Sequence, residues 1–288
     1  MMEETADSVT NKLEAEHPPM QFNKAMILSI GNELLIGKVL NTNAHWLSGE
    51  LTKMGFIVDS IVIVKDDVSE IASAFLSAIE RKVQLVISTG GLGPTFDDKT
   101  VEGLARAFSL PLVLNAEALA LVREKYSSRG LPLTPERIKM AYLPLGSKPL
   151  DNPAGTAPGV YLKYRGVHFF VLPGPPREVE AVFKTSVQPI IEREFQRIDF
   201  YEALLTIKGI PESEFAPFVK DAAERYKSVY VKSHPKGVEL GSPVLEIHLT
   251  TFGIENMSQL RSCFEYILMS AKKLGGEIIV LKEPGVKL

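Results

Sequence analysis

The sequence has few of the features that mark an exported, membrane-bound or nucleic-acid-binding protein. Its one cysteine, Cys263, excludes an internal disulfide framework and a zinc site built from several cysteines, and we expect it to be a small buried apolar side chain. No apolar run approaches the ~20 residues of a membrane span, and the N-terminus lacks the apolar segment of a signal peptide. The net charge is -3. We therefore expect a cytoplasmic protein with no nucleic-acid partner and no membrane partner.

Common catalytic and nucleotide-binding patterns are missing as well. In "STGGLGPTFDDKT", residues 88–100, no Gly-Lys-Ser/Thr follows the glycines, and Phe96 stands where a dinucleotide fingerprint has its third glycine. No Ser-His-Asp or Cys-His arrangement is indicated by spacing. No histidine is assigned to a metal, because paired ligand spacing is absent among His45, His168, His234 and His248.

From residue 24 onward, short apolar runs alternate with longer amphipathic stretches. This alternation is typical of strands and helices that succeed each other around a mostly parallel sheet. Strands are predicted at 25–31, 57–66 and 83–91, and helices at 42–55, 68–82, 99–108, 115–130 and 134–144. A hairpin is predicted at 159–176 with its turn at Arg165-Gly166, and then a helix at 177–195, interrupted near Pro189. Asp67 with Glu70 predicts a capping box.

The succession of predicted strands and helices changes near residue 199. Strands are predicted at 201–209, 228–237 and 243–253, helices at 211–226 and 255–275, and a last strand at 276–281. This βαββα plan is typical of a compact α+β module. We therefore expect an N-terminal tail at 1–23, an α/β domain at 24–197 and a small α+β domain at 198–288.

The first candidate cluster is the glycine turn after the strand at 83–91. Glycines let backbone amides approach a ligand, so this turn predicts a cradle for a phosphate or a carboxylate, and a tight strand-to-helix turn is the alternative. The candidate binding residues are Thr89, Gly90, Gly91, Gly93, Pro94 and Thr95.

Two aspartates, Asp97 and Asp98, end the same turn. A carboxylate about 4 Å from a phosphate would cost on the order of 4 kcal/mol at a surface-like dielectric, and a divalent cation would convert that repulsion into attraction. The turn therefore predicts a phosphate held together with a metal. Alternatively, one aspartate caps the following helix and the other interacts with its dipole.

The second cluster, at 29–43, follows the first strand. Its candidate residues are Gly31, Glu33, Asn41 and Asn43. Asn41 or Thr42 could instead cap the next helix. Asp66 closes the second strand, so three strand ends supply Glu33, Asp66 and Asp98, at the edge where open α/β sheets bind their ligands.

The third cluster consists of two Pro- and Gly-rich loops at 151–160 and 172–180. Such loops are pre-ordered and suit a rigid pocket wall, although turn formation alone explains each proline. Arg177 is a candidate phosphate contact and Glu178 a candidate metal ligand, with surface salt bridges as the alternative for both. The other candidate binding residues here are Gly155, Thr156, Ala157 and Gly174.

The three clusters together resemble the N-terminal domain of the competence-damage-inducible CinA family, which is similar to molybdopterin-binding domains. The resemblance rests on "GNELLIGKVLNTN", "VKDD", "STGGLGPTFDDKT", "NPAGTAPGV" and "LPGPPREVE". It implies a three-layer α/β/α sandwich with a mostly parallel sheet, followed by a small KH-type domain. It also implies that Asp66 and Asp98 match two acidic positions implicated in adenylyl chemistry among cofactor-assembling relatives.

The chain departs from that family pattern in three places. Asn32 stands where the family often has aspartate, and Met140 where a glutamine usually precedes the alanine. The chain ends at Leu288 without room for the C-terminal amidase domain of bacterial members, so amidase activity is not expected.

The resemblance implies a metal-dependent hydrolase of a nucleotide pyrophosphate, such as ADP-ribose or FAD, that releases AMP. Asp66, Asp98 and Glu33 are the expected catalytic residues, and Asp66, Asp98 and Glu178 the expected ligands of a divalent metal, magnesium or cobalt-like. The alternative is a non-catalytic module that binds a pterin or a nucleotide. Self-association is also expected from the resemblance. RNA binding by the small domain is disfavoured, because residues 201–288 hold eleven Lys/Arg against eleven Asp/Glu and no Gly-x-x-Gly clamp.

Overall fold

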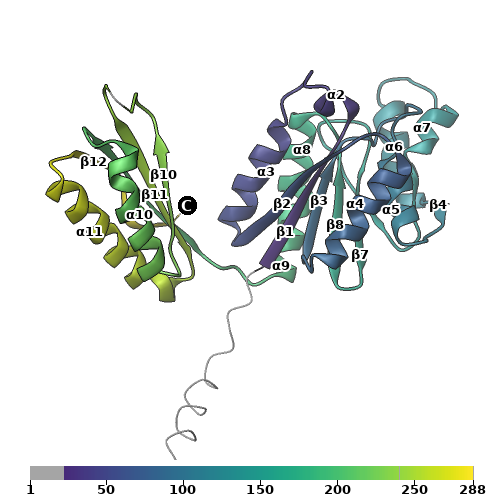
Figure 1. Cartoon of the computed structure of the whole chain (residues 1–288). Helices are drawn as coiled ribbons and strands as arrows, with labels where there is room; N and C mark the ends of the chain where they lie inside the picture. Colours follow the sequence, from purple (N-terminus) through teal and green to yellow (C-terminus); the bar gives the residue numbers. More distant parts are fainter. Residues whose placement is uncertain (1–22, 240, 288) are drawn as a thin grey trace, which may run out of the picture.

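The computed structural model describes residues 23–239 and 241–287, which form two sheet-based units (Figure 1). The predicted N-terminal tail at 1–23 lies outside the described residues except for Asn23, the first residue of a strand. None of the helices in the described ranges combines the length and the hydropathy needed to cross a membrane.

The larger unit is built on a six-stranded sheet with the order β2-β1-β3-β8-β7-β6. The first four strands in this order are parallel to one another, whereas β7 is antiparallel to β8 and β6 is antiparallel to β7. The strands are β1 (Asn23–Ile30), β2 (Phe56–Val64), β3 (Leu85–Thr89), β6 (Lys148–Leu150), β7 (Gly159–Tyr164) and β8 (Val167–Leu172). Every residue of β3 and β8 is buried, as expected for strands covered on both faces.

Helices cover both faces of this sheet (Figure 1). Alternate residues of β1 point into two different cores: Ala25 and Ile27 pack with α3 and α8, whereas Met26 and Leu28 pack with α4, α5 and α6. The helices are α2 (Asn32–Leu35), α3 (Thr42–Lys53), α4 (Val68–Glu80), α5 (Thr100–Ala107), α6 (Ala116–Ser127), α7 (Pro135–Lys139), α8 (Pro176–Val182) and α9 (Gln188–Glu194). The predicted three-layer α/β/α fold is confirmed.

Several local predictions are confirmed by hydrogen bonds and dihedral angles. The Asp67 carboxylate accepts from the backbone N–H groups of Ser69 and Glu70 at 3.0 and 3.1 Å, so it caps α4. Arg165 and Gly166 have φ angles of 48° and 81°, as a two-residue hairpin turn requires. The predicted interruption of the helix at 177–195 is a π-helical turn, Phe183–Val187, between α8 and α9.

The prediction of a helix at 134–144 was wrong in its extent. Its helical part, α7, ends at Lys139, and the chain then forms the short strand β5 (Tyr142–Pro144). β5 pairs antiparallel with β4 (Leu112–Leu114), a strand that the sequence patterns did not indicate. The pairing partner lies about thirty residues away along the chain, so the strand depends on tertiary structure rather than on local periodicity.

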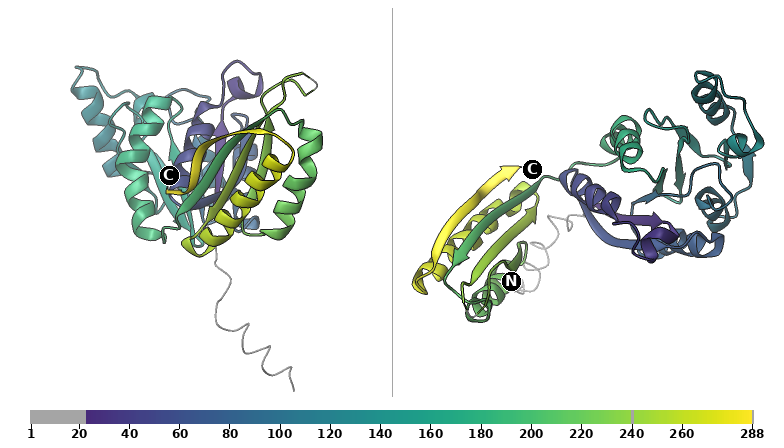
Figure 2. Two further views of the ribbon diagram at one scale, coloured as in Figure 1. Left: turned by 90° about the vertical axis from the view of Figure 1, so that its left-hand side faces the viewer. Right: turned by 90° about the horizontal axis from the view of Figure 1, so that it is seen from above.

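The small unit contains a four-stranded antiparallel sheet with the order β10-β11-β9-β12 and two helices, shown from two sides in Figure 2. Burial alternates along β9 and β11, so one face of the sheet packs against the helices in a core of its own. The elements are β9 (Phe200–Lys208), α10 (Glu212–Arg225), β10 (Tyr230–Pro235), β11 (Val244–Phe252), α11 (Met257–Lys273) and β12 (Glu277–Lys287), with a 3₁₀ turn at Ile254–Asn256. The predicted strand and helix order is confirmed, including the last strand.

The parallel strands decide where the candidate residues meet. β1, β2, β3 and β8 run in the same direction, so the segments that follow them emerge at one edge of the sheet. These segments contain the glycine turn, the cluster that begins at Gly31, Asp66, and the Pro-rich loop after Leu172.

Candidate functional site

A cleft of about 380 Å³ lies at this edge of the sheet. Thirteen of the predicted site residues line it: Gly31, Glu33, Asp66, Gly90, Gly91, Gly93, Pro94, Thr95, Asp98, Thr156, Ala157, Gly174 and Glu178. The fold therefore brings all three sequence clusters together in a single cavity. Asp97, which the sequence analysis discussed together with Asp98, also lines the wall. The remaining wall residues, Ile30, Leu92, Pro173 and Pro175, were not predicted as site residues.

The glycine turn presents unpaired backbone amides to this cleft. The N–H groups of Gly91, Leu92 and Gly93 donate to no residue in the described part of the chain. Gly91 has a φ angle of 67°, which turns the chain as a concave set of successive amides requires. Because all three residues line the cleft, their amides are suited to bind an anion.

The expected role of the Gly90 amide was wrong. Its N–H donates to the backbone oxygen of Leu172 at 3.1 Å, so the neighbouring strand β8 already uses it. A Cβ atom placed on Gly90 would lie 2.1 Å from the backbone oxygen of Ile30. Gly90 is thus needed for the close approach of two chain segments, and the available amides begin at Gly91.

The two aspartates hold the turn rather than the helix after it. The backbone N–H of Thr95 donates to Oδ2 of Asp98 at 2.8 Å, and the Thr95 hydroxyl contacts the carboxylates of both Asp97 and Asp98. The cap residue of α5 is Lys99, which makes no side-chain capping bond. The capping alternative for the aspartates is therefore wrong. The Thr95 hydroxyl is the main reason why the pKa of Asp97 is lowered.

Lys139 fixes the same turn from α7, although it was not among the predicted site residues. Its ammonium group donates to the backbone oxygens of Thr95 at 2.6 Å and Asp98 at 2.8 Å. Nothing in the local pattern around Lys139 indicates this contact, because the bonded residues lie more than forty positions away in sequence.

Asp66 and Glu33 approach the cleft from the other side. Oδ2 of Asp66 accepts from the backbone N–H of Asn32 at 2.8 Å, which joins the end of β2 to the start of α2. The Glu33 side chain is exposed and folds over Gly31, so that a Cβ placed on this glycine would lie 2.4 Å from Oε1 of Glu33. The Asp66 carboxylate is therefore fixed beside the cleft, and the Glu33 carboxylate lies next to Gly31 in the wall of the cleft.

Glu178 projects from α8 into the wall of the cleft, where the loop that contains Asn152 holds its side chain. The Asn152 side-chain amide donates to Oε2 of Glu178 at 2.7 Å and to the backbone oxygen of Ala157 at 2.9 Å. Asn152 is only 1% exposed, and it was not among the predicted site residues. A Cβ placed on Gly155 would lie 2.1 Å from Oε2 of Glu178. Gly155 itself lies outside the wall of the cleft but leaves the space that this carboxylate occupies.

Four further candidate residues lie outside the wall of the cleft. Asn41 caps α3 by accepting from the Ala44 N–H at 3.2 Å, so the capping alternative holds for Asn41. Asn43 donates to the backbone oxygen of Gly174 at 2.8 Å and supports the Pro-rich loop. Thr89 is buried at the end of β3, and Arg177 is exposed in the first turn of α8.

The described residues contain no group of three or more His, Cys, Asp or Glu side chains that could hold a metal by themselves. This does not conflict with the predicted cation. Magnesium is usually bound by one or two carboxylates together with substrate phosphates and water, rather than by a cage of protein ligands. Asp66 and Asp98 both line the cleft, and carboxylate oxygens are of the ligand type that this mode of binding uses.

Comparison with known proteins places this architecture in a family. Residues 26–193 match the family described as the probable molybdopterin binding domain. The chain belongs to this family. Its matching region ends within α9, so the match covers the large unit that carries the cleft.

Relatives of the chain occur in Pyrobaculum and Sulfurisphaera species. A protein of Pyrobaculum arsenaticum is 49% identical over 225 residues, which cover 78% of this chain and 84% of the relative. A protein of Sulfurisphaera tokodaii is 41% identical over 264 residues, which cover 90% of this chain and 99% of the relative. The chain is also similar to the crystal structure of the protein CinA, of unknown function, from Thermoplasma acidophilum. That comparison gives a TM-score of 0.55 and 43% identity, and it covers 58% of this chain and 99% of the other. The large unit is therefore a CinA-like domain of the molybdopterin-binding type.

Proposed function

We propose that the protein is a metal-dependent hydrolase of a nucleotide pyrophosphate, such as ADP-ribose or FAD, and that it releases AMP. The observation that carries the proposal is the shared cleft. Asp66 follows β2, Asp98 ends the glycine turn after β3, and both line the cavity that the unpaired amides of Gly91 to Gly93 also line. Anion-binding amides beside carboxylates suit a phosphate that arrives with a cation.

Each group has a distinct role in this proposal. The amides of Gly91, Leu92 and Gly93 bind the phosphoryl oxygens and stabilise the charge that gathers there in the transition state. Asp66 and Asp98 hold the divalent cation, which offsets negative charge on the phosphates. Glu33 orients the attacking water. The water oxygen bonds to the phosphorus of the AMP moiety, the bridging P–O bond breaks, and the protons of the water pass to solvent. For ADP-ribose the products are AMP and ribose 5-phosphate.

The test is a turnover assay with ADP-ribose and with FAD, with and without magnesium or cobalt, in which AMP release is followed. Asp66→Asn and Asp98→Asn keep the oxygen that accepts the backbone hydrogen bond but remove the charge, so we expect each to lower turnover by about a hundredfold or more. Asp67→Asn is the matched control, since it removes the adjacent charge and asparagine still caps a helix well. Wild-type turnover in Asp98→Asn would remove Asp98 from the mechanism.

The competing proposal is a module that binds a pterin or a nucleotide without cleaving it. One specific observation favours it: Asp66 and Asp98 both accept backbone hydrogen bonds and thus have structural roles of their own. On this view a nucleotide pyrophosphate stays intact after long incubation with either metal, while equilibrium titration still shows binding that is lost when Gly91 or Gly93 is replaced.

Two parts of the proposal, the KH-type assignment of the small unit and the self-association of the protein, rest on the family resemblance alone. We assign the small unit to the KH type and give it no catalytic role, because the residues that line the cleft all belong to the large unit. Amidase activity is not part of the proposed function. A self-associated form is expected, and light scattering of the purified protein tests it.

A further inference from the structure

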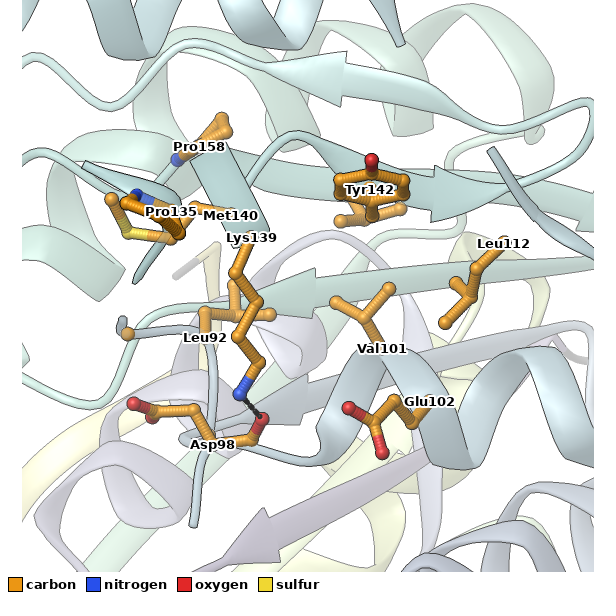
Figure 3. A pocket seen from close by; sticks show the side chains of 13 residues that line it. Leu92, Asp98, Val101, Glu102, Leu112, Pro135, Lys139, Met140, Tyr142 and Pro158 are labelled. Carbon is orange, nitrogen blue, oxygen red and sulfur yellow. Dashed lines mark hydrogen bonds between the residues drawn. The ribbon is translucent and has the colours of Figure 1, made fainter. Parts of the chain in front are cut away.

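A second cavity of about 250 Å³, here called the side cavity, lies against the glycine turn (Figure 3). It is enclosed by α5, α7 and the β4–β5 ribbon. The side cavity and the cleft share four wall residues, Gly91, Leu92, Gly93 and Asp98. The proposed hydrolase uses the cleft for its phosphate, and the side cavity has no role in the mechanism described above.

A second segment of the chain, Thr156 to Val160, also borders both cavities. Thr156 and Ala157 line the cleft, and Pro158 and Val160, which follow in the same segment, line the side cavity. The turn on one side and this segment on the other thus border both spaces. The side cavity is therefore adjacent to any phosphate that lies on the Gly91 to Gly93 amides.

The walls of the side cavity are mainly apolar. Leu92, Met140 and Val160 are buried, and Val101 projects into the space from α5. At the rim, Leu112 and Tyr142 are 37% and 43% exposed, which is high for such large apolar side chains. An apolar cavity of about 150 Å³ suffices to hold a benzene ring, so this space has room for a larger planar ring. Its size and walls suit an aromatic heterocycle.

Three charged side chains line this space, namely Asp98, Lys139 and Glu102, and they differ in their partners. The carboxylate of Asp98 accepts a hydrogen bond from the backbone N–H of Thr95. The ammonium group of Lys139 is already bonded to the backbone oxygens of Thr95 and Asp98. Glu102, in the first turn of α5, has no hydrogen-bond or ion-pair partner in the described ranges, and its carboxylate faces the space in Figure 3. An unpartnered carboxylate beside the apolar side cavity can accept a hydrogen bond from a ring that carries an NH₂ group.

We infer that the side cavity binds the amino-substituted planar ring of the ligand whose phosphate lies on the glycine turn, and that Glu102 accepts a hydrogen bond from the ring's amino group. The inference rests on the proposed function for the phosphate site, but it does not require cleavage. Adenine and pterin rings share this chemistry. Apolar contact supplies affinity for the ring, and Glu102 selects rings with the amino group.

The test compares three ligands by equilibrium titration in the presence of magnesium: AMP, purine riboside 5′-monophosphate, which lacks the amino group, and ribose 5-phosphate, which lacks the ring. We expect AMP to bind at least about tenfold more tightly than ribose 5-phosphate and several-fold more tightly than the purine compound. Neopterin monophosphate is titrated in parallel with AMP. The compound that binds more tightly shows whether the side cavity prefers a pterin ring or an adenine ring.

Two variants make the test specific. Val101→Phe fills the side cavity and should weaken AMP binding by about tenfold or more while leaving ribose 5-phosphate binding unchanged. Glu102→Gln should remove the preference for AMP over the purine compound. Val238→Phe, at an exposed position of the small unit, and Glu117→Gln, in the first turn of α6, are the matched controls. Thermal melting of each variant confirms that it folds, and Glu102→Gln tests the inference separately if Val101→Phe unfolds.

The outcomes separate this inference from the proposed function. Equal binding of AMP and ribose 5-phosphate, with no effect of Val101→Phe, overturns the side-cavity inference and leaves the phosphate site intact. Binding of neither compound overturns both. AMP binding that is sensitive to Val101→Phe, without cleavage of ADP-ribose or FAD, supports the inference and removes the hydrolase.

Discussion

The ammonium group of Lys139 lies 2.8 Å from the backbone oxygen of Asp98, although 41 positions separate the two residues in sequence. The same group donates to the backbone oxygen of Thr95, so a single side chain joins α7 to both ends of the aspartate turn. Two charge-assisted bonds to carbonyl oxygens restrict how far this turn can move. The arrangement of the carboxylates at the cleft thus depends on a residue from another part of the chain.

Lys139→Met keeps the length of the side chain but removes the donor. We expect faster amide hydrogen exchange at Thr95 to Asp98 and a loss of about 1 to 3 kcal/mol in the free energy of unfolding, because the two carbonyl groups lose a charged partner. Hydrogen-exchange mass spectrometry of the turn provides the measurement. Lys148→Met, on an exposed residue of β6, is the control. Unchanged exchange in the turn would show that it is held without Lys139.

Gly90→Ala tests the close approach of two strand ends. The added Cβ would lie 2.1 Å from the backbone oxygen of Ile30, and Gly90 has a φ angle of 99°. We expect a loss of more than about 2 kcal/mol, measured by urea unfolding. Gly146→Ala is the matched control, since Gly146 has a φ angle of 86° and a Cβ added to it would meet no described atom within 4 Å. Equal losses in the two variants would attribute the effect to backbone strain alone.

Metal binding should depend on the nucleotide. The described residues provide no group of three ligands, so we expect weak magnesium binding to the free protein and binding at least about tenfold tighter when a non-hydrolysable ADP-ribose analogue is present. Calorimetric titration, corrected for magnesium binding to the analogue itself, measures this coupling. Asp66→Asn combined with Asp98→Asn should abolish it. Tight magnesium binding without nucleotide would contradict the expectation.

His168 should make stability depend on pH. It is 4% exposed, its Nδ1 lies 3.0 Å from the Tyr161 hydroxyl, and its pKa is lowered, first by burial and then by the charge of Lys163. A histidine with a lowered pKa in the folded state binds protons preferentially when unfolded. Its contribution to stability is therefore complete above the unfolded pKa of about 6.5 and is lost as the pH falls through the folded value.

The unfolding midpoint in urea, measured between about pH 7.5 and pH 5, checks this sign. Wild-type protein should lose stability toward the acidic end, and His168→Gln should show a smaller loss, because glutamine does not titrate. His45→Gln, at an exposed histidine, serves as the control. A variant as pH-sensitive as the wild type would show that other groups cause the dependence.

Cys263 should be unreactive in the folded protein. It is fully buried in α11, and burial raises the pKa of its thiol to about 12. Because the thiolate is the reactive form, modification by Ellman's reagent at about pH 8 should be on the order of a thousandfold slower than in denaturant. The rate as a function of urea concentration then reports the opening of the small unit. Rapid modification in native buffer would contradict this burial.

Much of the fold could be predicted because its signals are local. Buried strands such as β1 and β3 appear as continuous apolar runs, and the amphipathic helices between them have their own period. The turn at Arg165-Gly166 and the cap at Asp67 depend on a few adjacent residues. The short strands β4 and β5 were not predictable in this way, since each gains its backbone partners only from the other.

The sequence by itself determined the composition of the cleft, because parallel strands end at one edge of a sheet and the residues that follow them must meet there. Only the tertiary structure decided which of these groups are available. The order of strands places β8 beside β3, and the backbone oxygen of Leu172 therefore accepts a hydrogen bond from the Gly90 amide. The packing of α7 brings Lys139 to the aspartate turn. It also leaves the side cavity between α7 and this turn. Periodicity and turn chemistry are properties of neighbouring residues, whereas these contacts join segments that are distant in the chain.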